Sequence, residues 1–101
     1  MEISSLLKNF LDKDGKLKAF PAKRKMKLYA LYYLSGKFEP DRIYTEKEVN
    51  ELLGCWHTFG DSATLRRELY DCRFIGREKN GASYWLEKAQ PDLETLEKKY
   101  G

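Results

Sequence analysis

The sequence predicts an α+β fold, and three observations lead to this prediction. Apolar residues recur with the spacing of amphipathic helices in four successive segments. A capping-box pattern marks the start of one of these helices. After the fourth segment, an Asn-Gly pair between two strand-like runs indicates a β-hairpin.

The first two helices are predicted from their apolar stripes. One covers residues 3–11 and ends at an Asp-Gly turn, after which residues 16–20 alternate as in an extended segment closed by Pro21. The other runs from Ala22 to about Gly36, a residue type that often ends helices. The stripe that we expect it to bury consists of Leu28, Leu31, Tyr32 and Leu34.

The third helix begins at a capping box and follows a short strand at residues 43–44. In this motif the Thr45 hydroxyl accepts a hydrogen bond from the Glu48 amide, and the Glu48 side chain accepts one from the Thr45 amide. The apolar stripe after the cap consists of Val49, Leu52, Leu53 and Trp56.

The fourth helix, predicted over residues 61–73, follows a turn at residues 57–60 and has Asp61 as its N-cap. Its apolar stripe consists of Leu65, Leu69 and Cys72. The hairpin at residues 74–87 turns at Asn80-Gly81, where we expect a type I′ turn with positive φ at both residues. The residues that we expect to share one core are Leu52, Leu53, Trp56, Leu65, Leu69 and Trp85.

The order of these elements predicts the architecture. From residue 22 onward a helix, a short strand, a helix, a tight turn, a helix and a hairpin follow one another, which is the succession of a winged helix-turn-helix. We therefore predict a single domain over residues 1–101 with a winged core at 22–87. Extra helices at 3–11 and 91–100 would pack outside this core or form a dimer contact.

The composition is that of a packed globule. With 101 residues, of which 42% are hydrophobic and 14% aromatic, the chain can bury one core without disulfides or metals. No apolar run approaches the roughly 18 residues of a membrane span, and no signal-peptide pattern is present. We therefore expect a cytoplasmic protein with no membrane partner.

Patterns that support catalysis or metal binding are sparse, so we predict neither an enzymatic activity nor a cofactor. The single histidine, His57, lies in the turn before the fourth helix. There it could act as an acid or base, contact a phosphate, or simply pack its ring. Cys55, His57 and Cys72 offer three soft ligands for zinc, but no fourth ligand has the customary spacing.

The fourth helix carries the candidate nucleic-acid contacts, because the second helix of a helix-turn-helix enters the major groove. Arginine can bind guanine through two hydrogen bonds, while serine and threonine adapt to several bases. Glu68 and Asp71 lie on the same helix, so the alternative is a solvated face of salt bridges. The candidate contact residues on this helix are Ser62, Thr64, Arg66 and Arg67.

The hairpin, as a wing, adds Arg77 and Lys79 as candidate contacts to phosphate or to the minor groove. A lysine at the edge of a sheet has another common role, which is to prevent unwanted strand pairing. Both interpretations of these two residues stay open.

The net charge of +3 is unevenly distributed along the chain. Residues 13–27 contain seven basic residues against one acidic residue, a local charge of +6. Cations at a helix N-terminus oppose the helix macrodipole, which favours anions there. The sequence therefore predicts a separate anion-binding surface, with solubility as the alternative explanation. Its candidate residues are Lys23, Arg24, Lys25 and Lys27.

Four segments carry a family resemblance: residues 21–25, residues 42–50, residues 63–69 and Tyr84-Trp85. In this order they resemble the Domain of Unknown Function 2087 family, over roughly residues 10–86. Its members are often described as transcriptional-regulator-like, and some carry an ArsR-type winged helix before this domain. The resemblance implies a winged-helix-like regulator. Because some members already carry an ArsR-type winged helix, it also leaves open that this domain binds something other than DNA.

One departure from the family pattern concerns the end of the fourth helix. Similar sequences usually have a glycine there, since the residue after a helix often adopts the left-handed conformation. This chain has Arg73 instead. We expect Arg73 to occupy the left-handed position or the helix to end in another way.

Together these features predict a DNA-binding, transcriptional-regulator-like domain. It would read duplex DNA through helix 61–73 and wing 74–87, and a homodimer would double its phosphate contacts. Two rival functions stay open. One is a protein-interaction or RNA-binding winged helix that uses Tyr29, Tyr32 and Tyr33 as a contact patch. The other is a module that senses an anionic effector through the basic segment at residues 23–27.

Overall fold

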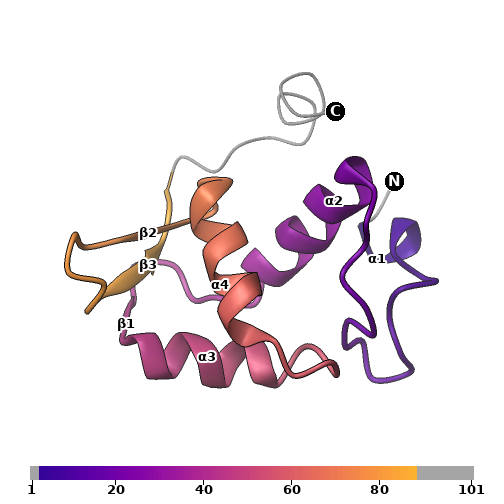
Figure 1. The fold of residues 1–101 in the computed structure, drawn as a ribbon, viewed down its shortest axis with the longest axis horizontal. Helices are drawn as coiled ribbons and strands as arrows, with labels where there is room; N and C mark the ends of the chain where they lie inside the picture. The colour runs from indigo at the N-terminus through magenta and orange to yellow at the C-terminus, as the bar shows by residue number, and fades with distance from the viewer. Residues whose placement is uncertain (1–2, 89–101) are drawn as a thin grey trace.

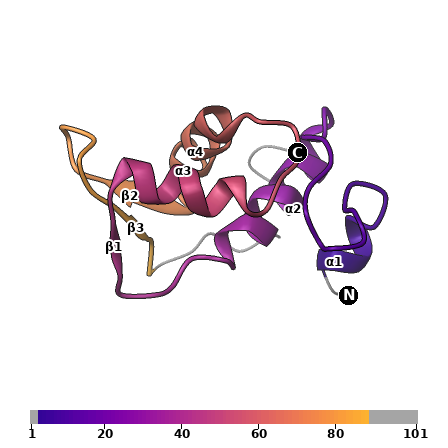
Figure 2. The same ribbon diagram turned by 90° about the horizontal axis from the view of Figure 1, so that it is seen from below.

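A computed structural model describes residues 3–88 of the chain, and it has an α+β fold (Figure 1). This part contains three helices of nine or more residues and a small antiparallel sheet. The sheet lies at one end of the molecule, and the first helical turn lies near the other (Figure 2). The elements are α1 (Ile3–Leu6), α2 (Arg24–Ser35), β1 (Ile43–Tyr44), α3 (Glu46–Gly54), α4 (Ser62–Asp71), β2 (Ile75–Arg77) and β3 (Tyr84–Leu86).

The first helix is shorter than the predicted range of residues 3–11, because α1 ends at Leu6 and is followed by turns. The backbone pairs with a later segment instead: the Asp12 amide donates to the Lys16 carbonyl at 2.8 Å and the Lys18 amide donates to the Phe10 carbonyl at 2.7 Å. The Asp12 carboxylate also accepts hydrogen bonds from the backbone amides of residues 14 and 16. Such local side-chain bonds compete with helix formation, and here they form a tight loop.

The extended segment predicted at residues 16–20 is reduced to a single bridging residue, Leu17. Its amide donates to the Trp56 carbonyl at 2.8 Å, and its carbonyl accepts from the Thr58 amide at 2.9 Å. The Leu17 side chain is fully buried. The N-terminal loop is therefore attached to the turn between α3 and α4.

Helix α2 begins at Arg24 and buries the three predicted leucines, but Tyr32 is 38% exposed, so its predicted burial was wrong. Because α2 contacts both α1 and α4, its buried arc extends to Tyr29 and Ala30 and leaves Tyr32 at the margin. There the Tyr32 ring packs edge-on against Phe74, with the centroids 6.2 Å apart.

The predicted caps of α3 and α4 are confirmed. The Thr45 hydroxyl accepts from the Glu48 amide at 3.1 Å, and the Glu48 carboxylate accepts from the Thr45 amide at 2.9 Å. This last bond is the main reason why the pKa of Glu48 lies below its usual value. The Asp61 carboxylate accepts from the Thr64 amide at 3.2 Å and caps α4. These contacts fix where both helices begin.

Helix α4 ends in a Schellman motif with Arg73 in the left-handed conformation, at φ +65°. The Phe74 amide donates to the Leu69 carbonyl at 2.9 Å, and the Arg73 amide donates to the Tyr70 carbonyl at 3.0 Å. The departure from the family pattern therefore places an arginine where glycine would be unstrained.

We expect Arg73→Gly to leave the free energy of unfolding unchanged or to raise it by up to about 1 kcal/mol, although glycine is more flexible in the unfolded chain. Urea unfolding followed by circular dichroism checks this. Arg73→Ala is the matched control, because alanine keeps the β-carbon that causes the strain. A clear loss of stability in the glycine variant would contradict the expectation.

The sheet has the strand order β1-β3-β2, and both pairings are antiparallel. The hairpin is present, but the predicted type I′ turn is wrong, because Gly81 has a positive φ of 72° and Asn80 does not. The last backbone bond joins Glu78 to Ser83, so four residues form the loop. The Asn80 side chain accepts from the Ala82 amide at 2.9 Å, which stabilises this longer connection.

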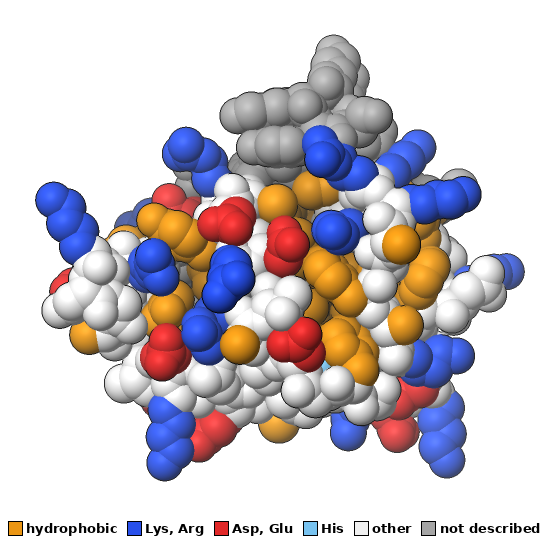
Figure 3. Space-filling view, in the orientation of Figure 1, with side chains coloured by type: hydrophobic (Ala, Val, Ile, Leu, Met, Phe, Trp, Pro, Cys, Tyr) orange, Lys and Arg blue, Asp and Glu red, His pale blue; other side chains and the backbone are white. Residues whose placement is uncertain are grey.

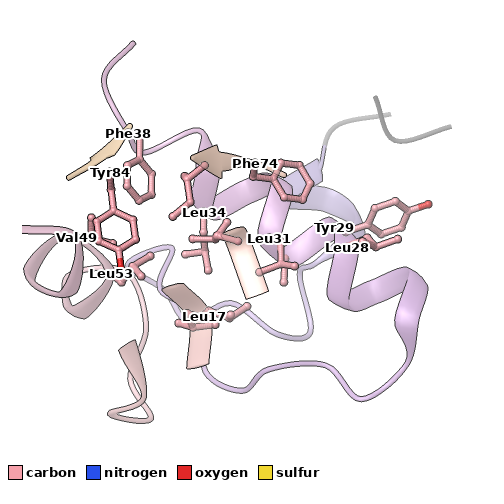
Figure 4. Packing of buried hydrophobic residues seen from close by; sticks show 14 of the residues in the cluster. Leu17, Leu28, Tyr29, Leu31, Leu34, Phe38, Val49, Leu53, Phe74 and Tyr84 are labelled. Carbon is pink, nitrogen blue, oxygen red and sulfur yellow. The ribbon is translucent and has the colours of Figure 1, made fainter. Parts of the chain in front are cut away.

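Five of the six predicted core residues lie in or against the core. Leu53, Leu65 and Leu69 are fully buried, and Leu52 and Trp56 are partly buried against them. Figure 4 shows the labelled side chains of α2, α3, β3 and the loops gathered in one cluster, with Tyr29 at its margin.

The sixth predicted core residue, Trp85, lies on the outer face of the sheet. Successive side chains of a strand point to opposite faces, and Tyr84, which is 1% exposed, takes the inward position. The Trp85 indole covers Gly76 on the neighbouring strand, where a β-carbon would come within 2.5 Å of the indole nitrogen. The core prediction for Trp85 was therefore wrong by one position along the strand.

Candidate nucleic-acid interface

Helix α4 presents a continuous exposed face. Its buried side is formed by Leu65 and Leu69, and it packs mainly against α3. The helical period places a second group of residues away from this contact, and all of them are exposed. They are Ala63, Thr64, Arg67, Tyr70 and Asp71.

Two of the predicted contact residues, Ser62 and Arg66, turn toward α3 instead. The Ser62 hydroxyl donates to the Asn50 carbonyl at 3.1 Å. The Arg66 guanidinium donates to the Asn50 side chain and lies 3.3 Å from the Glu46 carboxylate, with 19% of its side chain exposed. Both residues therefore fasten α4 to α3, while Thr64 and Arg67 remain on the exposed face.

Arg77 on β2 is held against α4. Its guanidinium carbon lies 4.5 Å from the centroid of the Tyr70 ring, within the range of a cation–π contact. Hydrogen bonds to the hydroxyls of Tyr84 and Tyr70 raise the pKa of Arg77. The other predicted wing residue, Lys79, is exposed in the loop after β2.

A hollow of about 260 Å³ lies where α4 meets β2. Three arginines and one aspartate contribute to its walls, so the hollow has an excess of positive charge. Its lining residues are Arg66, Arg67, Tyr70, Asp71, Arg77 and Tyr84. We refer to it below as the arginine pocket.

The two tyrosines of the arginine pocket were not among the predicted site residues. The sequence held a signal for one of them, because a correct hairpin register pairs Arg77 with Tyr84. Tyr70 is reached only through the packing of α4 on the sheet, which the hairpin pattern does not specify.

The charge on this side of the molecule is mixed. Figure 3 shows Lys and Arg side chains over α4 and the neighbouring sheet, interspersed with Asp and Glu. Hydrophobic side chains are visible between α4 and α2 (Figure 3). Any anion bound here would therefore contact discrete arginines instead of a uniformly basic surface.

The basic segment at the start of α2 is divided between two environments. Arg24 and Lys27 line a second hollow together with Glu68 and Asp71 of α4. Lys23, at the N-cap, and Lys25 are exposed. Of the four predicted anion-binding residues, Arg24 and Lys27 thus lie in the same hollow as two carboxylates of α4. The sequence of the basic segment alone does not predict this proximity.

Lys27 and Lys25 also contact aromatic rings. The Lys27 ammonium lies 5.2 Å from the centroid of the Phe20 ring, and that of Lys25 lies 5.9 Å from the centroid of the Tyr29 ring. These contacts help to keep the basic segment on the surface of α2.

The three tyrosines proposed as a contact patch do not form one. Tyr29 is buried, and the Tyr33 hydroxyl donates to the Gly15 carbonyl at 2.7 Å. Tyr32 is exposed, but its ring packs against Phe74. Of the three tyrosines, only Tyr32 is therefore an exposed residue.

His57 is buried and uses both ring nitrogens within the fold. Nδ1 lies 2.5 Å from the Leu53 carbonyl oxygen, and Nε2 accepts from the Asp61 amide at 2.9 Å. Of the two cysteines considered with it as zinc ligands, Cys55 is exposed and Cys72 is partly buried. Among the described residues, no group of three or more His, Cys, Asp or Glu side chains could hold a metal ion.

Burial is the main reason why the pKa of Cys72 is raised, and the nearby Glu68 and Asp71 add to the effect. A raised pKa keeps this thiol protonated and therefore a weak nucleophile.

No helix between residues 3 and 88 is long and apolar enough to cross a membrane.

Comparison with known proteins identifies one family. The family described as "Uncharacterized protein conserved in bacteria (DUF2087)" matches residues 16–86, a segment that begins before Leu17 and ends with β3. No curated protein and no solved structure matches the chain.

Proposed function

The chain belongs to the DUF2087 family of uncharacterized bacterial proteins, and from this premise we propose that it is a winged helix-turn-helix domain that binds duplex DNA. Helices α3 and α4 with their tight turn would form the helix-turn-helix, and the β2–β3 hairpin would form the wing. The strand order β1-β3-β2, with β1 directly before α3, supports this assignment.

The observation that carries the proposal is that the exposed face of α4 and the cationic residue of β2 share one surface. Arg67 and Arg77 line the same pocket, and Thr64 lies one turn before Arg67 on the exposed face. A groove-reading helix needs exposed polar side chains, together with cations beside it that hold the phosphate backbone. This surface supplies both.

The contacts of the described residues suggest a division of roles. Thr64 would reach base edges, while Arg67, Arg77 and Lys79 would contact phosphates. Arg66 would act indirectly, since its bonds to α3 set the orientation of α4. The exposed Lys23 and Lys25 at the start of α2 would attract the polyanion without reading its sequence.

We expect Arg67→Ala to weaken binding to every duplex by about 1–3 kcal/mol, because it removes a charge-assisted hydrogen bond to a backbone phosphate. Lys25→Ala should weaken binding to all duplexes alike and reduce the slope of log K against log salt by about one. The measurement is fluorescence anisotropy with a duplex selected from a random pool and with unrelated duplexes, at three salt concentrations.

The matched control is Lys8→Ala, which removes one exposed positive charge near α1, far from the sheet (Figure 1). It should change affinity and salt slope little. The stoichiometry of the same titration distinguishes one bound copy from two. If the wild-type protein binds no duplex in a salt-dependent manner at low salt, the DNA-binding proposal is wrong, and a protein-interaction role takes its place.

A further inference from the structure

We propose that the arginine pocket between α4 and β2 is a binding site for a single phosphate group. The pocket is smaller than the roughly 300–1,000 Å³ of sites that hold drug-sized ligands, so it suits one small group. That group would be a phosphate of the DNA backbone, in which case the inference rests on the proposed function, or the phosphate of a free small molecule.

The first argument is that Arg77 is positioned without being neutralised. Its guanidinium carbon lies 4.5 Å from the centroid of the Tyr70 ring, which holds the group in place and carries no charge. Tyr84 is itself immobilised, because it is 1% exposed and pairs with Arg77 on β2 and Tyr44 on β1. A guanidinium that is already fixed loses little conformational entropy when it binds an anion.

The second argument concerns the charges around the pocket. Among the described residues, no ion pair involves Arg67 or Arg77, whereas Arg66 pairs with Glu46. Two of the three guanidinium groups thus keep their charge available for a ligand. Planar guanidinium groups bind the oxygens of a phosphate through paired hydrogen bonds.

The third argument concerns Asp71, the acidic residue of the pocket. It also lines the second hollow, beside Arg24 and Lys27 of α2. In that hollow the two cations balance the two carboxylates of Asp71 and Glu68, so the three arginines of the pocket outweigh Asp71. If the inference is right, Asp71→Asn should strengthen phosphate binding by removing the remaining repulsion.

The test uses inorganic phosphate as the probe and nuclear magnetic resonance of the ¹⁵N-labelled full chain. Phosphate is titrated at constant ionic strength, with chloride as the balancing anion. We expect saturable shifts of the Arg67 and Arg77 side-chain Nε–H signals and of the Gly76 amide. Shifts that chloride reproduces, or that fail to saturate, would overturn the inference.

Variants locate the site. Arg77→Gln and Arg67→Gln should each weaken phosphate binding at least about tenfold, as expected for the loss of hydrogen bonds between charged partners. Lys8→Gln, which removes an exposed charge elsewhere, should change it less than about twofold. Arg67 lies on the exposed face of α4, so its variant remains informative even if Arg77→Gln disturbs the hairpin. Equal effects of all three variants would overturn the inference.

Measuring duplex binding alongside the phosphate titration distinguishes a backbone phosphate from a free phosphorylated molecule. It also tests the pocket inference separately from the DNA-binding proposal. If phosphate saturates the pocket and the protein binds no duplex, the pocket stands with a free phosphorylated molecule as its ligand, and the DNA proposal fails. If phosphate inhibits duplex binding more than chloride does at equal ionic strength, a backbone phosphate is the ligand. If duplexes bind while phosphate causes no saturable shift, the pocket inference fails and the DNA proposal stands.

Discussion

Replacing Leu65 with alanine is expected to lower the free energy of unfolding by about 2–5 kcal/mol, the usual cost of removing a buried leucine side chain and leaving a cavity. Leu65 is fully buried on the side of α4 that faces the core. Urea unfolding of the purified chain measures the change. Ala63→Gly is not a suitable control, since glycine weakens helices by itself, and Thr64→Ala serves instead.

Thr64 precedes Leu65 directly and is exposed, so its alanine variant should stay within about 0.5 kcal/mol of the wild type. A near-neutral Leu65→Ala would mean that α4 presents another face to the core. That outcome would also remove the basis for assigning Thr64 and Arg67 to the exposed surface.

The elements that the sequence predicted correctly depend on local contacts. The caps at Thr45 and Asp61 each join groups three residues apart, so the residue types alone identify them. The left-handed conformation of Arg73, one of the two alternatives that the sequence left open, is likewise local, because the end of a helix favours it regardless of distant packing.

Two of the wrong predictions, the length of the first helix and the burial of Trp85, involve contacts between distant segments. The apolar stripe of residues 3–10 suits a helix, but the bonds of Leu17 to the α3–α4 turn draw the following backbone into a loop. Trp85 and Tyr84 both suit a strand, and only the packing of the sheet on the helices decides which one is buried.

The candidate site shows the same division. The helical period of α4 places Ser62 and Arg66 on the same side as the buried Leu69. The spacing of these residues alone therefore predicts that both side chains face α3, as the structure shows. The partner of Arg66, however, is Glu46, which is 20 residues earlier in the chain. The meeting of Tyr70 with Arg77 likewise depends on how α4 docks on β2, and a periodicity within one element carries no information about that docking.

Replacing His57 with alanine is expected to lower the free energy of unfolding by roughly 1–3 kcal/mol, because it removes a buried ring and takes away the hydrogen-bond partner of the Asp61 amide. The Leu53 carbonyl can only accept a hydrogen bond and the Asp61 amide can only donate one, so the neutral ring must carry its proton on Nδ1. The ring also packs edge-on against Phe59, with the centroids 4.7 Å apart.

The measurements are urea unfolding and hydrogen exchange of the Asp61 amide, which should be protected in the wild type and exchange much faster in the variant. His57→Gln is the conservative control, because glutamine has both a donor and an acceptor and should recover part of the loss. A catalytic or ligand-binding histidine would give a different result, since its removal would change activity and leave stability and Asp61 protection intact. A stable alanine variant with a protected Asp61 amide would therefore contradict the structural role. We therefore expect His57 to stabilise the turn before α4, and in this way to fix the position of the helix that carries the proposed interface.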